Sequence, residues 1–236
     1  GGESTIIEEH YQLLEKCIQL GHASKIELRY NSNGIEMPDR LFDLWGHFQK
    51  VRFHFSIDAL GERNDYIRYP SRWSDIEKQL HRLDQTPDSV EVTIACAVQA
   101  LNIADIPNLI RWKLEQGFRK INPWPFGAGL INFHLVYHPP HLNVKVLPQA
   151  LKADIAQQFD EFYGWLRQNH PNPLGLQTSA YGLRRLQGLI SFMMSEDWSR
   201  RLPELREYLV RMDEIRGLDG RQIFPELALL WEAPSA

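Results

Sequence analysis

The chain has 236 residues, 43% hydrophobic and 24% charged, which is ordinary for a globular protein with a substantial core. Its formal net charge of −4 gives no electrostatic reason to expect nucleic-acid binding, and its apolar runs are too interrupted to span a membrane. The two cysteines, Cys17 and Cys96, stand in apolar patterns typical of small buried residues, so we expect a reducing, cytoplasmic setting.

Strand-like and helical patterns alternate along the first 148 residues. Thr5 and Glu8 have the spacing of a capping box for a helix that ends at Gly21. Further helices are predicted over 38–48, from about residue 71 with Ser71 or Ser74 as its cap, and over 105–118. Strands are predicted over 25–31, 51–57 and 90–98, with a last strand region made of 120–124 and 130–137.

After residue 148 the strand patterns cease. Helical patterns follow over 150–169, 181–194, 203–215 and 221–231. We therefore predict an α/β part over 1–148 and a helical extension over 149–236 packed on it. Strands and helices that alternate about every 30 residues are typical of βαβ units, which build a parallel sheet as a barrel or as a doubly wound fold.

The chain opens with Gly1, Gly2 and Glu3. Paired glycines let a backbone approach a ligand closely, and a carboxylate beside them can hold an ammonium group. Two opening glycines are equally typical of a cloning remnant. The residues alone leave both interpretations open.

Other polar residues end the predicted strands, where parallel α/β folds bind ligands. Asn33 follows one strand, but asparagine also favours turns, so a structural role explains it equally well. Ser56 and Asp58 interrupt an otherwise apolar strand, which favours a functional role. Arg68 comes shortly after them and either clamps a ligand carboxylate or pairs with a neighbouring acid at the surface.

No metal site is expected. His134 and His138 share a strand face, but at the usual rise they lie about 13 Å apart, too far for one ion.

These residues belong to segments in which the chain resembles the radical S-adenosylmethionine (radical SAM) enzymes, most closely the bacterial members with a twitch-type auxiliary-cluster domain. The resemblance covers nearly the whole chain. The segments that carry it are Gly1 to Glu3, Asn31 to Gly34, Ser56 to Asp58, Asn64 to Ser71, Val146 to Pro148, Asp213 to Gly217 and Phe224 to Leu227.

The resemblance implies a partial (βα)6 TIM-like barrel that lacks its first strand and carries a C-terminal helical extension. It also implies S-adenosylmethionine and a [4Fe–4S] cluster, whose reductive chemistry yields a 5′-deoxyadenosyl radical. A flavodoxin or ferredoxin would supply the electron, and the substrate would be an unknown molecule, possibly a peptide.

The resemblance also implies roles for the site residues. The segment Gly1, Gly2 and Glu3 would meet the methionyl ammonium, and Asn33 joins the cofactor-binding set. Further along the chain, Ser56 and Asp58 would line the methionine and ribose, and Arg68 would face the carboxylate.

The chain departs from the family in one respect. The cluster motif C-x3-C-x2-C does not occur, and Cys17 and Cys96 cannot supply the three or four thiolates that a cluster needs. We therefore expect an inactive fragment that lacks its first strand and cluster loop. The strand over 25–31 would then be an exposed edge and could favour a dimer.

Two alternatives remain open. One is a cluster-free module that binds S-adenosylmethionine, a nucleoside or a peptide without catalysis. The other is a barrel-type hydrolase or isomerase that uses Glu3, Asp58 and His134.

Overall fold

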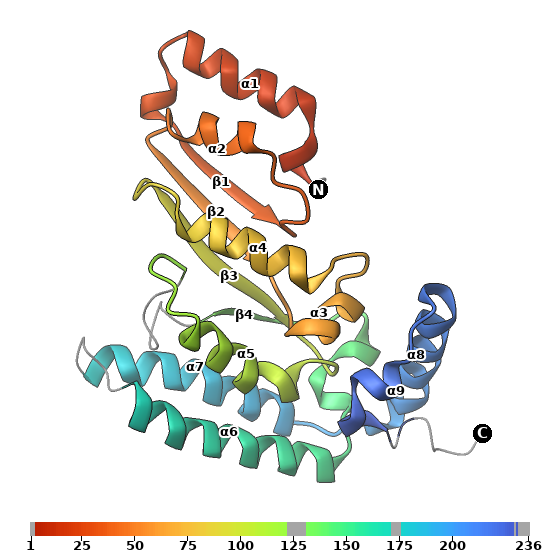
Figure 1. Cartoon of the computed structure of the whole chain (residues 1–236). Helices are drawn as coiled ribbons and strands as arrows, with labels where there is room; N and C mark the ends of the chain where they lie inside the picture. Colours follow the sequence, from red (N-terminus) through yellow and green to blue (C-terminus); the bar gives the residue numbers. More distant parts are fainter. Residues whose placement is uncertain (1–2, 122–130, 171–175, 229, 231–236) are drawn as a thin grey trace.

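A parallel four-stranded sheet with the order β1-β2-β3-β4 lies at the centre of the fold (Figure 1). The computed structural model describes residues 3–121, 131–170, 176–228 and 230, so Gly1 and Gly2 lie outside the described residues. The strands are β1 (Glu27–Ser32), β2 (Lys50–Ser56), β3 (Val90–Val98) and β4 (Asn132–Leu135). The predicted α/β class with a parallel sheet is confirmed, and β1 lies at one edge of the described sheet.

Helices precede and follow these strands as the alternating pattern predicts. The helices up to β4 are α1 (Glu8–Gln19), α2 (Asp39–Trp45), α3 (Gly61–Ile67), α4 (Trp73–Asp84) and α5 (Ile106–Glu115). The helices after it are α6 (Gln149–Asn169), α7 (Leu176–Met194), α8 (Leu202–Arg216) and the short α9 (Gly220–Ile223). The single helix predicted over 221–231 is therefore wrong within the described residues, because α9 is followed by a separate 3-10 turn, η8 (Pro225–Leu227).

The last predicted strand region lies along β3 in two places. Ile121 forms an isolated parallel bridge with Val92, and Asn132 of β4 pairs with Ala95 further along β3. The rest of 120–124 and the start of 130–137 lie outside the described residues. The strand is therefore shorter than the 130–137 that the sequence predicts.

The two faces of the sheet differ in character. Along β2, Phe53 and Phe55 are fully buried on the face that α2 and α4 cover, where the ring of Trp45 of α2 lies tilted against Phe53, 5.6 Å between centroids (Figure 1). On the opposite face Arg52 and His54 are only half-buried. The hydrophobic core therefore lies mainly between the sheet and the helices on one side.

Two predicted helix caps are wrong. Thr5 is fully buried, and its hydroxyl lies 2.9 Å from the Glu3 carboxylate and 2.9 Å from the Glu36 carbonyl, so α1 starts without a side-chain cap. The N-cap residue of α4 is Arg72, whose side chain makes no capping hydrogen bond. Neither Ser71 nor Ser74 is therefore the cap that the sequence predicts. In the first case a tertiary contact competes with the local motif for the same hydroxyl.

The C-terminal helices pack on the α/β part at several places. Helix α6 contacts α5, and α9 contacts α3. Part-buried polar groups of α3 add to these contacts: the Tyr66 hydroxyl donates to Asp213 of α8 over 2.8 Å, and Arg63 pairs with Glu226 of η8 through both of its terminal nitrogens. These bonds fix α8 and α9 beside α3 (Figure 1).

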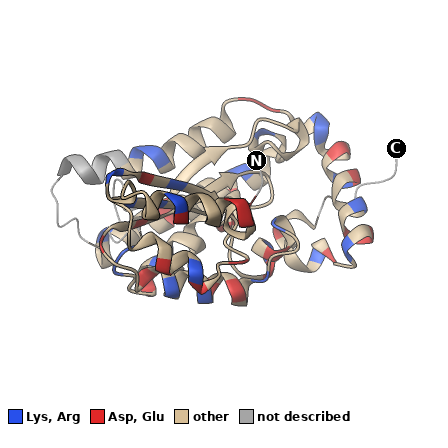
Figure 2. Ribbon diagram, turned by 90° about the horizontal axis from the view of Figure 1, so that it is seen from above, with Lys and Arg blue, Asp and Glu red and all other residues tan. Residues whose placement is uncertain are grey.

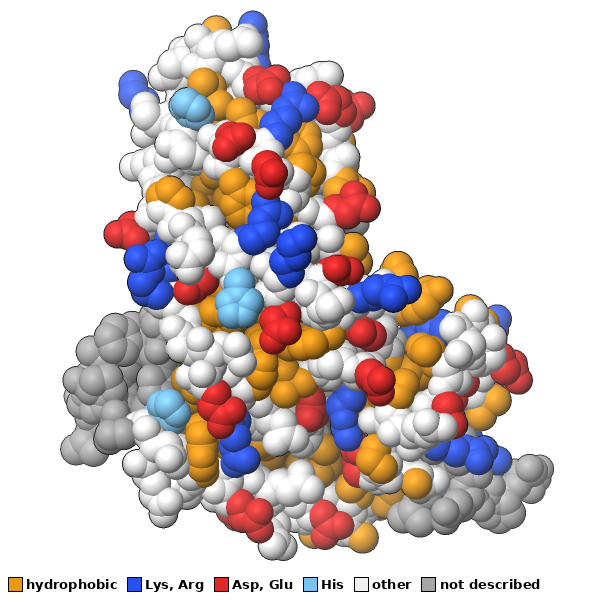
Figure 3. Space-filling model, viewed as in Figure 1, with side chains coloured by type: hydrophobic (Ala, Val, Ile, Leu, Met, Phe, Trp, Pro, Cys, Tyr) orange, Lys and Arg blue, Asp and Glu red, His pale blue; other side chains and the backbone are white. Residues whose placement is uncertain are grey.

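Acidic and basic residues are interleaved along the helices, as the view from above shows (Figure 2). On the face drawn in Figure 3 they are likewise mixed over the described residues rather than gathered into a basic stripe. Among the described helices, none combines the length and the apolar character that crossing a bilayer requires.

Candidate functional site

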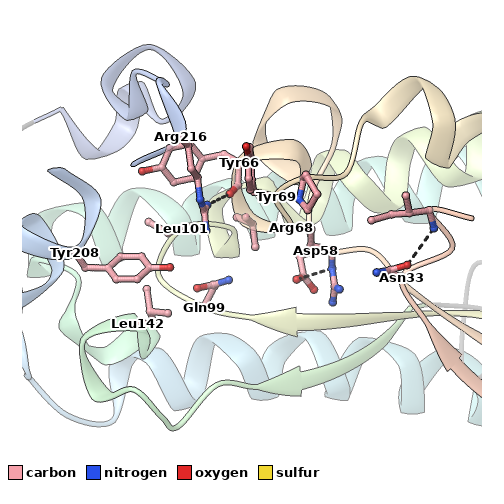
Figure 4. A pocket seen from close by; sticks show the side chains of 13 residues that line it. Asn33, Asp58, Tyr66, Arg68, Tyr69, Gln99, Leu101, Leu142, Tyr208 and Arg216 are labelled. Carbon is pink, nitrogen blue, oxygen red and sulfur yellow. Dashed lines mark hydrogen bonds and ion pairs between the residues drawn. The ribbon is translucent and has the colours of Figure 1, made fainter. Parts of the chain in front are cut away.

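A cavity of about 360 Å³ lies at the carboxyl edge of the sheet, where β1, β2 and β3 end (Figure 4). Its volume falls within the range of small-molecule sites in proteins, near the lower limit. It is lined by Asn33, Ile35, Asp58, Tyr66, Ile67, Arg68, Tyr69, Pro70, Gln99, Leu101, Leu142, Tyr208 and Arg216. The position agrees with the general rule for ligand sites in parallel α/β folds.

Asp58 and Arg68 form an ion pair in the wall of this cavity. The Arg68 Nε lies 2.9 Å from Asp58 Oδ2, and Asp58 Oδ1 accepts the Ala97 N–H over 2.6 Å. The Asp58 side chain is 5% exposed, whereas that of Arg68 is 24% exposed. Because the pair uses Nε, the two terminal nitrogens of the guanidinium remain as donors toward a ligand.

The backbone around Asp58 is held by two buried amides. The side-chain oxygen of Asn64 accepts the Asp58 N–H over 3.0 Å, and the side-chain nitrogen of Asn102 donates to the Asp58 carbonyl over 2.8 Å. Burial raises the pKa of the Asp58 carboxyl, and the Arg68 charge and the Ala97 N–H oppose that rise. The site therefore holds this carboxylate rigidly in a poorly hydrated place.

Glu3 is not among the lining residues, but it contacts the lining residue Asn33 just after the end of β1. Its carboxylate accepts the Asn33 N–H over 3.1 Å and lies 2.9 Å from the Thr5 hydroxyl. The Asn33 side chain accepts the Ile35 N–H over 3.1 Å, which shapes the turn that lines the cavity. A carboxylate has about four acceptor positions, so Glu3 keeps the capacity for an ammonium donor.

Aromatic and apolar side chains form the remaining wall. Tyr69 is 55% exposed and marks the rim, while Leu101 is buried and Tyr208 enters from α8 (Figure 4). Arg216, the last residue of α8, donates to the Tyr66 carbonyl. One end of the cavity is therefore polar and the other is largely apolar, with a single arginine.

The structure brings several of the predicted site residues together. Asn33, Asp58 and Arg68 line one cavity, and Glu3 contacts Asn33 directly. Ser56 ends β2, and neither Ser56 nor Glu3 is among the lining residues.

The sequence analysis missed the contribution of α8. Tyr208 and Arg216 line the cavity although they stand about 150 residues after the strand ends. Tyr208 occurs in an ordinary amphipathic helix, and no local pattern marks it. Arg216 lies within Asp213 to Gly217, a segment quoted for the resemblance, which gave it no role. Tyr66 and Tyr69 lie within the segment quoted for the resemblance, which gave no role to either.

The lining does not assemble an acid–base pair. Among the described lining residues Asp58 is the single carboxylate, and none is a histidine. His134 lines a separate, open cavity between β4 and α7. The combination of Glu3, Asp58 and His134 is therefore not gathered in one cavity.

The residues present do not fit an iron–sulfur cluster. Cys17 lies in α1 and Cys96 is fully buried inside β3, where burial raises the pKa of its thiol well above the ordinary value. Within the described ranges no group of three or more histidine, cysteine, aspartate or glutamate side chains could hold a metal ion. A cluster needs three or four thiolates.

No protein-family model matches the chain, and a search of curated proteins finds no match to it. The functional argument therefore depends on the cavity and on the motifs that surround it.

Proposed function

We propose that this chain forms part of a radical SAM (βα)6 barrel and that the cavity at the carboxyl edge binds S-adenosylmethionine. The position of the cavity and the pairing of Asp58 with Arg68 support the proposal. The observation that carries it is the partly exposed Arg68 guanidinium, which follows α3, pairs with Asp58 just beyond the end of β2 and lies within the segments that resemble the family.

The methionine end of the ligand suits the polar end of the cavity. The terminal nitrogens of Arg68 bind the ligand carboxylate as a planar fork, and Asp58 orients that fork through Nε. Glu3 takes the ammonium beside the turn at Asn33. Asp58 thus acts on the ligand mainly by positioning Arg68.

The amide of Gln99 supplies hydrogen bonds for the hydroxyl groups of the ribose. Gln99 is 7% exposed and lines the cavity at the end of β3. An amide can both donate and accept, as vicinal hydroxyls require. S-adenosylmethionine, when bound, supplies a sulfonium whose carbon–sulfur bonds can be cleaved.

Because the two cysteines do not fit a [4Fe–4S] cluster, we derive no radical step from these residues. The same observation favours a second candidate function, a cluster-free module that binds S-adenosylmethionine or a related nucleoside. Both candidates require the same binding event.

Calorimetric titration of the purified chain with S-adenosylmethionine tests the proposal. We expect saturable binding, and we expect Arg68→Gln to weaken it by about 10-fold to 100-fold, because a charge-assisted hydrogen bond contributes about 1.5–3 kcal/mol. Absence of saturable binding by the wild-type chain would contradict the proposal.

The matched control is Arg29→Gln. Arg29 is an exposed arginine of β1 that pairs with Glu27 on the open face of the sheet, away from the cavity lining. Its replacement should leave the affinity unchanged. Equal losses in both variants would mean that general charge, rather than the cavity, governs binding.

A further inference from the structure

The cavity contains two arginines and one aspartate among its ionised lining residues. Asp58 pairs with Arg68, so Arg216 is left as the second cationic group of the lining. The structure records no carboxylate within ion-pair distance of Arg216 among the described residues. Arg216 is therefore the ionised residue of the described lining that has no charged partner within the lining.

Arg216 is held in one place by its surroundings. Its guanidinium donates to the Tyr66 carbonyl and lies 5.7 Å from the Tyr66 ring and 5.2 Å from the Tyr69 ring. The nearby carboxylate of Asp213 is occupied by the Tyr66 hydroxyl and by the Gly220 N–H. A guanidinium has five N–H donors, and the recorded hydrogen bond uses one of them.

The surroundings of Arg216 suit a ligand with an apolar body. Leu101 is 2% exposed, and Leu142 and the Tyr208 ring lie in the same wall (Figure 4). Water competes weakly for an ion pair that forms against such a wall, so a carboxylate there gains more than it would at an open surface.

We infer that Arg216 binds the carboxylate of the substrate, a carboxylic acid with an apolar or aromatic body, such as an amino acid or the end of a peptide. This inference deepens the proposed function, on which it rests: S-adenosylmethionine occupies the Arg68 end, and the substrate enters at the Arg216 end. At about 360 Å³ the cavity is too small to enclose two large molecules, so the substrate inserts only this part of itself past the exposed Tyr69.

A matched pair of probes tests the assignment. N-acetyl-tyrosine carries a carboxylate, and N-acetyl-tyrosinamide is the same molecule with a neutral amide. We expect the wild-type chain to bind the acid about tenfold more tightly than the amide in calorimetric titrations. Arg216→Gln should abolish this preference by weakening the acid alone, and Arg216→Lys should keep part of it because the charge remains.

Arg211→Gln is the control, since Arg211 is an exposed arginine on the same helix and is absent from the lining. It should keep the full preference for the acid. Thermal unfolding of every variant establishes that it is folded. Equal affinity of the wild-type chain for acid and amide, or an unchanged preference in folded Arg216→Gln, would overturn the assignment and leave Arg216 as a tie between α8 and α3.

Titration of wild type and Arg216→Gln with S-adenosylmethionine separates the two proposals. Retained S-adenosylmethionine binding without an acid preference would overturn only the role of Arg216. An acid preference without S-adenosylmethionine binding would overturn the proposed function and leave a carboxylate site.

Discussion

Along β2, the side chains that point toward α2 and α4 are Val51, Phe53 and Phe55, and all three are fully buried. Those on the opposite face, Arg52 and His54, are half-buried and polar. Parallel strands usually bury both faces and contain nearly continuous apolar runs. Here apolar and polar residues alternate instead, as they do in sheets with one solvated face.

Charged side chains that form ion pairs cover the open face of the sheet. Arg52 lies 3.5 Å from Glu91, its register partner on β3, and 3.1 Å from Glu27 on β1, which stands two residues before the β1 position opposite Arg52. Such partly exposed pairs contribute little to stability. The comparison indicates that the helix-covered face provides most of the folding free energy, and that the cavity depends on it for its rigidity.

Replacement of a core phenylalanine should have the largest effect. Phe53→Ala removes a fully buried ring that packs against Trp45, and we expect a loss of about 3–5 kcal/mol in the free energy of unfolding. Its sequence neighbour on the other face, Arg52→Ala, should cost about 0–1 kcal/mol. Urea denaturation measures both, and similar losses would remove the distinction between the faces.

Gly34 tests whether the turn beside the cavity depends on the same core. It has a φ of +64°, and a Cβ there would lie 2.2 Å from the Phe55 ring. Gly34→Ala should cost about 1–2 kcal/mol for the left-handed backbone and about 1–3 kcal/mol for the steric overlap.

Gly21→Ala is the control for the backbone term. Gly21 has a φ of +71°, but nothing lies within 4 Å of a Cβ placed there. It should show the cost of the backbone alone in thermal or urea unfolding. Equal losses at the two glycines would mean that the Phe55 ring moves aside freely.

The Tyr66 hydroxyl tests how much the contact between α3 and α8 contributes to stability. Its hydroxyl is buried, donates to Asp213 over 2.8 Å, and has its pKa raised by burial, so it stays protonated. Tyr66→Phe should cost about 1.5–3 kcal/mol, because a bond to a charged acceptor is lost. Tyr69→Phe should change stability by less than about 0.5 kcal/mol, since Tyr69 is 55% exposed. If both variants unfold at the same urea concentration, the hydroxyl does not anchor α8.

Asp58 gives the smallest expected effect, a change in how stability depends on pH. Burial raises its pKa above 3.8, so the folded state holds the proton more tightly than the unfolded chain does. The stability that Asp58 contributes is therefore full below pH 3.8 and is lost as the pH rises through the raised pKa. Asp58→Asn removes this contribution.

Urea denaturation of the wild type and of Asp58→Asn, from below pH 3.8 to above the raised pKa of Asp58, provides the measurement. The stability of the wild type relative to the variant should fall as the pH rises and then become constant. The other buried carboxyls are common to both proteins and cancel in the difference. A relative stability that rises with pH would mean that the Arg68 charge, rather than burial, dominates the pKa of Asp58.

The sequence by itself determined the parallel α/β class, the order of the strands, and the place of Asn33 and Asp58 at one edge of the sheet. These features follow from local patterns, because apolar periodicity defines each strand and the ends of parallel strands meet at the same edge. The short α3 was missed, since its seven residues have no apolar period and no capping side chain.

Tertiary structure alone decided the rest of the site. The Arg216 donor and the Tyr66 carbonyl that fix α8 at the cavity are 150 residues apart, and the spacing within α8 does not encode which surface it will cover. Thr5 likewise has the pattern of a helix cap but contacts the Glu36 carbonyl, 31 residues away. Contacts of this kind depend on how the finished elements pack together, and local periodicity contains no information about that packing.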